Sequence, residues 1–331
     1  MKFDKEILQT LGNHHKILME LIQKNIKNLN TTKELYYFIE NYFINNNLSK
    51  SFPIGISINE FIAHDSYHEF DKIKFKKGDL IKVDFGLEKN GNIIDAARTF
   101  EYNDNLSLSS INDCRDIVLE IENYSKELLA TENKITVQKL SQRIYDLITK
   151  KGYFALDFLG GHTIEFGKVH GKKLILNKPL EKLPPQSHKF IDKDWIIEEG
   201  EMFAIEVFIP SNKNIVGGKL ENGKMVQNIR KNPTHFEIER DLLDKKEEIL
   251  KDRDDLKKII DELVLETKLL PFNYMYFKKY SPKDIKELID KKLILVHLPL
   301  EWVDNNKRKL KYIQYEDCFL IINNDIICLT R

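Results

Sequence analysis

The sequence has few cysteines and no excess of charge of either sign. Its 331 residues include only Cys114, Cys318 and Cys328, which are too few and too scattered for a disulfide framework or a thiolate zinc site. A reducing compartment is therefore expected. Lysine plus arginine total 52, as do aspartate plus glutamate, so the formal net charge is zero. A dedicated nucleic-acid binder would carry a basic excess, and we expect no such function.

Long hydrophobic runs are also missing. No stretch approaches the roughly 18 consecutive apolar residues of a membrane span. The first residues, MKFDKEILQTLGNHHK, contain acids and histidines where a secretory signal needs an apolar core. The composition itself is that of a globular protein, with 42% hydrophobic and 31% charged residues. We therefore expect a cytoplasmic protein that does not associate with membranes.

Hydrophobic periodicity divides the chain into helical and strand-rich parts. Residues 1–50 have helical spacing, with a second helix beginning behind Thr31 or Thr32 as its N-cap. This predicts an N-terminal helical segment packed on a domain formed by residues 51–331. The charged, helix-forming stretch at about 225–300 is expected to interrupt that domain as a helical insertion. Further helices are predicted over 113–130 and 137–152, and strands over 203–210 and in the last 20 residues.

Two aspartates lie on the arms of a predicted hairpin. Asn90-Gly91, between two β-rich runs, is the strongest short hairpin signal in the chain. Asp84 and Asp95 face each other directly if the loop is 88–91, or lie diagonally on one face if the turn is centred on Asn90-Gly91. Either register brings both carboxylates within reach of one ion. Acids are common in this chain, so the pair could also arise by chance.

Three further residues stand out for their surroundings. Glu206 lies in the apolar run FAIEVF and Glu316 in YIQYEDCFLI, where an ionised carboxylate needs a partner unless the strand is an edge facing water. His162 follows Gly160-Gly161, a position also compatible with an ordinary loop or core histidine. Four carboxylates and one imidazole suit Mn, Fe, Co or Zn. Their four negative charges balance two divalent ions, and a water shared by such ions is a hydrolytic nucleophile.

These residues, in this order, resemble the type II methionine aminopeptidases of the pita-bread fold. The resemblance extends to SFPIGISINEFIAH, to KVH and to LLPFNYMYF, and the gap of 110 residues between the two glutamates favours type II over type I. It implies an α+β pita-bread fold with a helical insertion subdomain. The metal-ligand motifs are VDFG with Asp84, IIDAA with Asp95, GHTI with His162, FAIEVF with Glu206 and QYED with Glu316.

The resemblance also implies roles for the five ligands. Asp84 would chelate one of two divalent ions (Co, Mn, Fe or Zn), while Asp95 and Glu316 would bridge both. His162 would complete the shell of one ion. Glu206 would ligate and also hold the proton of a hydroxide bridging the two ions, acting as general base and then as general acid.

Substrate contacts follow from the same resemblance. His64 would contact the scissile amide and the leaving-group nitrogen, and His170 would hydrogen-bond the substrate carbonyl. Phe52 would line the methionine pocket together with Pro271 and Phe272. The implied activity is removal of the N-terminal methionine from nascent proteins with a small second residue. The expected partners are nascent polypeptide N-termini, with the ribosome as a further candidate, and the expected state is a monomer.

Three departures and two alternatives accompany this interpretation. Two residues after Glu316, Cys318 replaces the usual threonine, and HDSYHEF lacks the proline that commonly follows the active-site histidine. The loop IPSNKNIVGGKLENG matches weakly. All three departures bear on substrate preference more than on metal binding. One alternative is a non-catalytic pita-bread binding protein of the proliferation-associated or ribosome-associated type. The other is a proline-specific peptidase of the same fold. Retention of all five ligands favours an enzyme over the binding protein, because empty carboxylate clusters repel one another. The helical insertion and the FPIGISINE segment favour the methionine-specific enzyme over the proline-specific one.

Overall fold

The computed structural model describes residues 3–331 except 70–71, 104–108, 186–187, 189–190, 214–223, 228–234 and 304–309. Within these residues the helices are α1 (Lys5–Asn25), α2 (Thr32–Asn45), α3 (Ser109–Glu132), α4 (Val137–Lys150), α5 (Lys246–Ile249), α6 (Asp254–Thr267) and α7 (Pro282–Asp290), with 3-10 turns η1 (Ile26–Asn28), η2 (Leu180–Lys182), η6 (Arg240–Lys245) and η7 (Tyr274–Phe277). The strands are β1 (Ser49–Lys50), β2 (Gly55–Ile58), β3 (Phe61–Ala63), β4 (Leu80–Lys89), β5 (Asn92–Glu101), β6 (Ile135–Thr136), β7 (Gly160–Ile164), β8 (Leu174–Leu176), β9 (Ile196–Ile197), β10 (Met202–Pro210), β11 (Lys224–Gln227), β12 (His235–Ile238), β13 (Ile294–His297), β14 (Leu300–Val303), β15 (Tyr312–Ile322) and β16 (Asp325–Cys328). In this part of the chain no helix has both the length and the apolar character to cross a membrane.

The two N-terminal helices form where the apolar periodicity predicted them. Thr31 is the N-cap of α2, and its hydroxyl accepts a hydrogen bond from the Glu34 backbone N–H. Helix α1 buries a stripe that includes Leu8, Leu11 and Leu18, at the spacing of one helix face. This stripe joins the apolar cluster of strands β4 and β5, so α1 supports the strand pair that carries both aspartates.

Strands β4 and β5 form the predicted hairpin. Lys89 pairs with Asn92, which makes the turn the two residues Asn90 and Gly91. Both have positive φ, 52° and 82°, as a type I′ turn requires. The other edge of β4 pairs with β1 and β2, so β4 is an interior strand.

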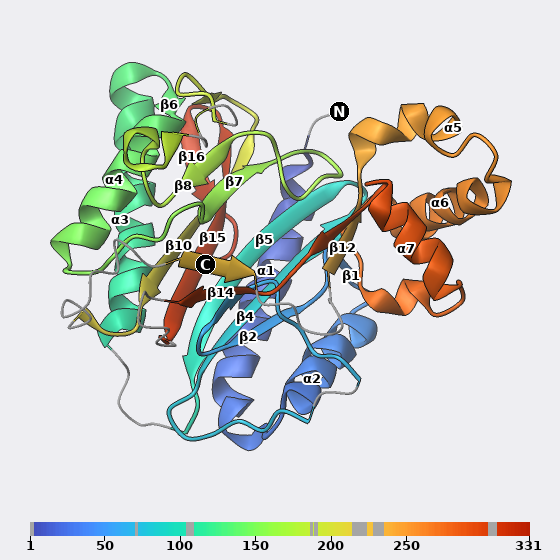
Figure 1. Cartoon of the computed structure of the whole chain (residues 1–331). Helices are drawn as coiled ribbons and strands as arrows, with labels where there is room; N and C mark the ends of the chain where they lie inside the picture. The colour runs from blue at the N-terminus through green and yellow to red at the C-terminus, as the bar shows by residue number, and fades with distance from the viewer. Residues whose placement is uncertain are drawn as a thin grey trace.

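A second sheet has the strand order β16-β15-β10-β7-β8 and packs against α3 and α4 through an apolar cluster. Figure 1 shows β15 running beside β5, so the two sheets meet along these strands. Side chains join them: the Thr99 hydroxyl donates to the Gln314 carbonyl at 2.8 Å, and Lys82 Nζ donates to the Tyr312 carbonyl at 3.2 Å. Ligand residues from both sheets can therefore meet at this seam.

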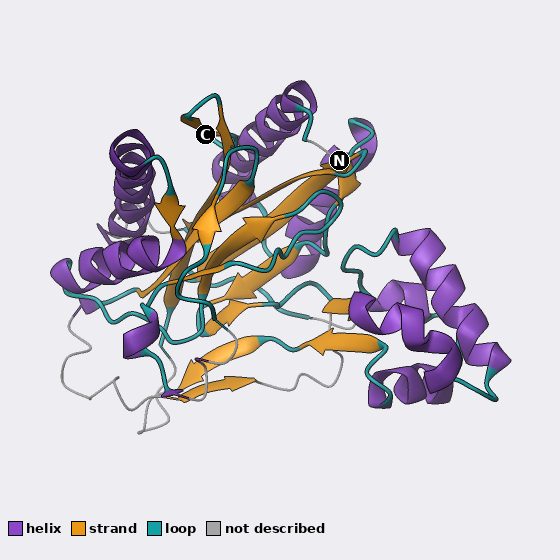
Figure 2. Cartoon of the chain, turned by 90° about the horizontal axis from the view of Figure 1, so that it is seen from above, coloured by secondary structure: helices purple, strands orange, loops and turns teal. Residues whose placement is uncertain are grey.

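The predicted insertion contains helices, but it begins and ends in strands. Helices α5–α7 form a group at one side of the molecule (Figure 2) and pack around their own apolar cluster. We expected helix from the start of THFEIERD, yet His235–Ile238 form β12, which pairs with β13 beyond the helices. Strand β14 pairs with β11 and with β3. The expectation of helix over His235–Ile238 was wrong, because this strand gains its hydrogen bonds from β13, a partner far away in sequence.

Candidate metal centre and active site

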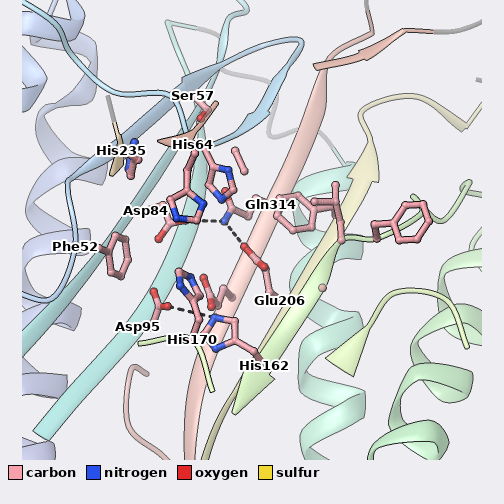
Figure 3. Close-up of a pocket in the computed structure, with 18 of the residues that line it drawn as sticks. Phe52, Ser57, His64, Asp84, Asp95, His162, His170, Glu206, His235 and Gln314 are labelled. Atoms are coloured by element: carbon pink, nitrogen blue, oxygen red, sulfur yellow. Dashed lines mark hydrogen bonds and ion pairs between the residues drawn. The ribbon is translucent and has the colours of Figure 1, made fainter. Parts of the chain in front are cut away.

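A buried cavity of about 280 Å³ lies where the two sheets meet. Strands β4, β5, β7, β10 and β15 each point one acid or histidine into it (Figure 3). The five residues predicted as metal ligands line this cavity, as do the three predicted substrate contacts, Phe52, His64 and His170. The fold thus brings together residues that lie between positions 52 and 316.

Asp84 and Asp95 lie on one face of the hairpin. Asp84 pairs with Ala97, and Asp95 pairs with Gly86, so the two carboxylates are diagonal neighbours rather than direct partners. This is the second of the two registers considered from the sequence, the one centred on Asn90-Gly91. Side chains on one face of a sheet recur at every second residue, and both acids therefore reach the same cavity.

Glu206 and Glu316 are direct partners across strands β10 and β15. Strand β10 lies between β15 and β7, and β15 lies between β16 and β10. Neither is an edge strand, so the alternative of glutamates facing water from an edge does not apply. Like charges directly opposite each other destabilise a sheet unless something compensates them.

The acids and the histidine form two overlapping groups. The ligand atoms of Asp95, His162 and Glu316 all lie within 4.8 Å of one another, and so do those of Asp84, Glu206 and Glu316. Glu316 belongs to both groups. This arrangement has the form of two adjacent ion sites that share one carboxylate.

Burial dominates the electrostatics of these carboxyl groups. It raises the pKa of Asp84 to about 6, opposed by a hydrogen bond from Gln314. Burial and then the Asp84 charge raise the pKa of Asp95 well above its usual range. Burial followed by neighbouring carboxylates does the same for Glu206 and Glu316. Each of these four carboxyl groups therefore ionises less readily than a carboxyl group in water.

His162 has one nitrogen directed at the carboxylates. Its Nδ1–H donates to the Thr163 carbonyl at 3.0 Å, because a carbonyl oxygen can only accept. The lone pair is then on Nε2, which lies 3.7 Å from Asp95 Oδ2. Burial lowers the pKa of His162, so the contact is between a neutral imidazole and an acid rather than an ion pair. A backbone carbonyl on the second nitrogen is typical of metal-binding histidines.

Glycine before His162 allows strand β7 to approach β10 closely. A Cβ on Gly161 would lie 1.9 Å from the Ala204 carbonyl oxygen, a distance that a real side chain does not tolerate. The glycine at position 161 is therefore required by packing. Because it has no side chain, β7 can place the His162 imidazole beside the acids of β5 and β15.

Gln314 is a cavity residue that sequence reasoning missed. Its amide Nε2 donates to Asp84 Oδ2 at 3.0 Å and to Glu206 Oε1 at 2.7 Å. Figure 3 shows this amide lying between the two acids. The available signal was its place two residues before Glu316, on the same face of the same strand.

Two further histidines were also missed, and they lie in the segment interpreted as helical. His235 begins β12 and His297 ends β13, and both line the cavity near His64 and His170. Burial lowers the pKa of His64 to about 4 and that of His235 to about 3. The pKa of His170, an exposed residue of the cavity wall, is also lowered well below its usual range, by desolvation and by the neighbouring histidines. These three imidazoles are neutral near pH 7.

The remaining expectations are partly met. Phe52 and Pro271 line the cavity, but Phe272 does not; it packs against Phe236 in the apolar cluster of the insertion. Cys318 is fully buried in the main core and does not line the cavity. Residues 214–223 of the weakly matching loop after Glu206 lie outside the described residues.

Comparisons with known proteins agree with this geometry. The model of metallopeptidase family M24 matches residues 6–244. The chain belongs to this family.

Relatives and solved structures place this M24 chain more closely. It is 26% identical over 250 residues to a methionine aminopeptidase of Archaeoglobus fulgidus, covering 74% of this chain and 78% of that protein. It is 30% identical over 224 residues to methionine aminopeptidase 2-1 of Talaromyces marneffei, covering 62% of this chain and about half, 48%, of that protein. The structure of a thermophilic Arx1 has a TM-score of 0.69 at 14% identity, covering 99% and 91% of the two chains. The fold is the α+β pita-bread fold expected from the sequence.

Proposed function

We propose that this M24 protein removes the N-terminal methionine from nascent proteins whose second residue is small, using two divalent metal ions. The observation that carries the proposal is the pair of ligand groups that share Glu316. Two adjacent sites with mixed oxygen and nitrogen ligands suit borderline divalent ions. The methionine aminopeptidases among the relatives supply the substrate class.

The side chains of the cavity fit a pair of cations. Asp84 Oδ1 and Asp95 Oδ1 are buried and accept no hydrogen bond from the described part of the chain. Uncompensated buried carboxylate oxygens cost free energy unless they take up protons or bind a cation. Bound divalent ions would acidify a water molecule and polarise the scissile carbonyl. The proposed ligands are Asp84, Asp95, His162, Glu206 and Glu316.

Glu206 is assigned the proton transfer. Its carboxylate lies at the cavity wall, where Gln314 holds Oε1 by the 2.7 Å hydrogen bond. In the proposal the Glu206 carboxylate accepts the proton of the nucleophilic water and later delivers it to the departing amine. Gln314 fixes the orientation of the carboxylate during both transfers.

The neutral histidines are assigned to the reacting amide. His64 donates one ring N–H to the Leu298 backbone carbonyl, so its second nitrogen carries a lone pair and can accept from the amide N–H of the scissile bond. His170, which is also neutral, can donate to the substrate carbonyl as negative charge develops there. Phe52 and Pro271 supply apolar wall for the thioether side chain, and the small cavity favours a short second residue.

The test is release of free methionine from short peptides by purified protein, with Mn²⁺ or Co²⁺ added or with EDTA. We expect metal-dependent release from Met-Ala-Ser and Met-Pro-Gly, and little from Met-Leu-Ser or Leu-Ala-Ser. Cleavage that requires proline at the second position would support the proline-specific alternative. No release by folded, metal-loaded protein would contradict the proposal and favour the non-catalytic binding protein.

A further inference from the structure

The backbone of His64 is in an unusual conformation. His64 directly follows β3 and has φ of 60°, in the left-handed region that non-glycine residues rarely adopt. Such a conformation costs roughly one or more kcal/mol and persists only when the surroundings fix it. The neighbours of His64 therefore determine where its imidazole points.

The ring of His64 is held by the two-stranded sheet at the base of the insertion. Its N–H donates to the carbonyl of Leu298, the residue after β13. The ring of His297 meets it edge-on with centroids 5.5 Å apart, and that of His235 lies 6.1 Å away. His235 and His297 are direct partners in the β12–β13 register. Figure 3 shows His64 and His235 at the same end of the cavity.

Glu237 holds His297 in turn. Glu237 lies two residues after His235, so it is a diagonal neighbour of His297 on the same face of the sheet. Its Oε2 is 3.3 Å from His297 Nε2, and its side chain is 14% exposed. Glu237 is not part of the cavity wall. Its contact with the cavity is through His297.

The loop after His64 is fixed to the insertion as well. The His68 ring stacks on Tyr274 of η7 with centroids 4.1 Å apart. The Glu69 carboxylate pairs with Lys278 at 2.8 Å, and the Glu69 N–H donates to the Tyr274 hydroxyl. The insertion thus contacts the segment that carries His64 from two directions.

We propose that Glu237 and His297 are positioning residues that hold the His64 imidazole against the substrate amide, so that the insertion is part of the catalytic apparatus. This inference rests on the proposed function. A separate metal site is not favoured, because within the described residues the groups of three ligand atoms lying within 4.8 Å of one another do not include these histidines. The contacts in the insertion instead form a chain: Glu237 orients His297, and His297 and the Leu298 carbonyl orient His64.

A double-mutant cycle tests this chain of contacts. Glu237→Gln keeps the shape of the side chain but weakens its hold on His297. We expect kcat for Met-Ala-Ser to fall roughly 3- to 10-fold, the effect of one weakened hydrogen bond, with KM unchanged. In a His64→Ala background, where kcat is already reduced roughly 10²- to 10³-fold, Glu237→Gln should have no further effect. The matched control is Glu248→Gln, the same substitution at an exposed glutamate of α5, which should leave both constants unchanged.

Each outcome distinguishes positioning from a general structural effect. An equal loss of kcat in both backgrounds would overturn the proposal, because Glu237 would then act independently of His64. An unchanged kcat in Glu237→Gln would do the same.

A measurement that does not depend on catalysis separates this inference from the proposed function. The nitrogen-15 shifts of labelled histidines report the tautomer and environment of each ring. We expect wild-type His64 to populate one tautomer, and Glu237→Gln but not Glu248→Gln to shift the His297 and His64 resonances. If the wild-type protein releases no methionine yet these shifts occur, the proposed function fails while the positioning contacts stand. Unshifted His64 resonances would overturn the inference.

Discussion

Ionisation of Asp95 is opposed both by burial and by a neighbouring carboxylate. Asp95 lies on the strand beside β15, near Glu316 and His162 in one ligand group, and the charge of Asp84 adds to the effect of burial on its pKa. Its Oδ1 accepts no hydrogen bond from the residues that the structure describes. The buried carboxyl groups of the site are therefore stabilised when a proton or a cation neutralises them.

Replacing Asp95 with asparagine therefore tests the metal centre. Asp95→Asn removes one ligand charge, and we expect kcat to fall by roughly three orders of magnitude, since a metal supplies several kcal/mol of transition-state stabilisation. Metal content measured by mass spectrometry should fall with it. The thermal stability of the metal-free variant should not drop, because a buried acid is lost. Asp146→Asn, an exposed position on α4, is the control. A fully active Asp95→Asn would contradict the two-ion proposal.

The five residues predicted as ligands could be singled out from sequence and do line one cavity, but their pairing across strands could not be predicted in full. Asp84 and Asp95 are close along the chain, and an Asn-Gly turn fixes their register locally. Glu206 and Glu316 face each other although they are 110 positions apart in the sequence, and no local signal specifies that match. His297 was missed for the same reason: its partner strand begins at His235, in a charged stretch whose composition favours helix.

At the scale of elements, helix α1 supports the ligand strand β5. The buried His15 ring donates from Nε2 to the Ala96 carbonyl at 3.1 Å, next to Asp95. Gly12, one turn earlier, lies against the C-terminal segment, where an added Cβ would be 1.9 Å from the Leu329 carbonyl oxygen. The helix can approach so closely only because residue 12 has no side chain.

Gly12→Ala is expected to destabilise the protein by about 1–3 kcal/mol or more, the usual cost of overpacking a tight contact. The clash is with backbone, which cannot rotate away, so it outweighs the higher helix propensity of alanine. Urea unfolding measures the effect, and Gln9→Ala on the exposed side of α1 should change stability by no more than about 0.5 kcal/mol. Equal stability of the two variants would show that α1 does not pack as described.

For the protein as a whole, the proposed metal binding would compete with protonation for the same carboxyl groups. An acid whose pKa is raised by folding destabilises the fold as pH rises from the unfolded to the folded pKa, because the unfolded chain releases a proton that the folded state must keep. For Asp84 this window runs from its ordinary value of 3.8 to about 6. For the other three acids it extends to higher pH, since their pKa values are raised well above normal.

The increase in melting temperature on adding Mn²⁺, relative to EDTA, is therefore predicted to grow between about pH 5 and about pH 8. Subtracting the melting temperature in EDTA from that in Mn²⁺ removes the contribution of groups that titrate without contacting the metal. Asp95→Asn should show a smaller increase over the same range. A metal-induced shift that is independent of pH, or larger at the acidic end, would contradict the assignment of these carboxyl groups as ligands.

Both ligand groups require Glu316, and this sets the order in which the centre is made. During synthesis Asp84 and Asp95 are available early, and strand β15 leaves the translation machinery much later. A hairpin with two diagonal aspartates must wait through more than two hundred further residues for its remaining partners. In the proposed centre, metal uptake would therefore follow the emergence of β15 rather than guide the folding of the hairpin. Each new molecule would take its metal from the pool present at that time.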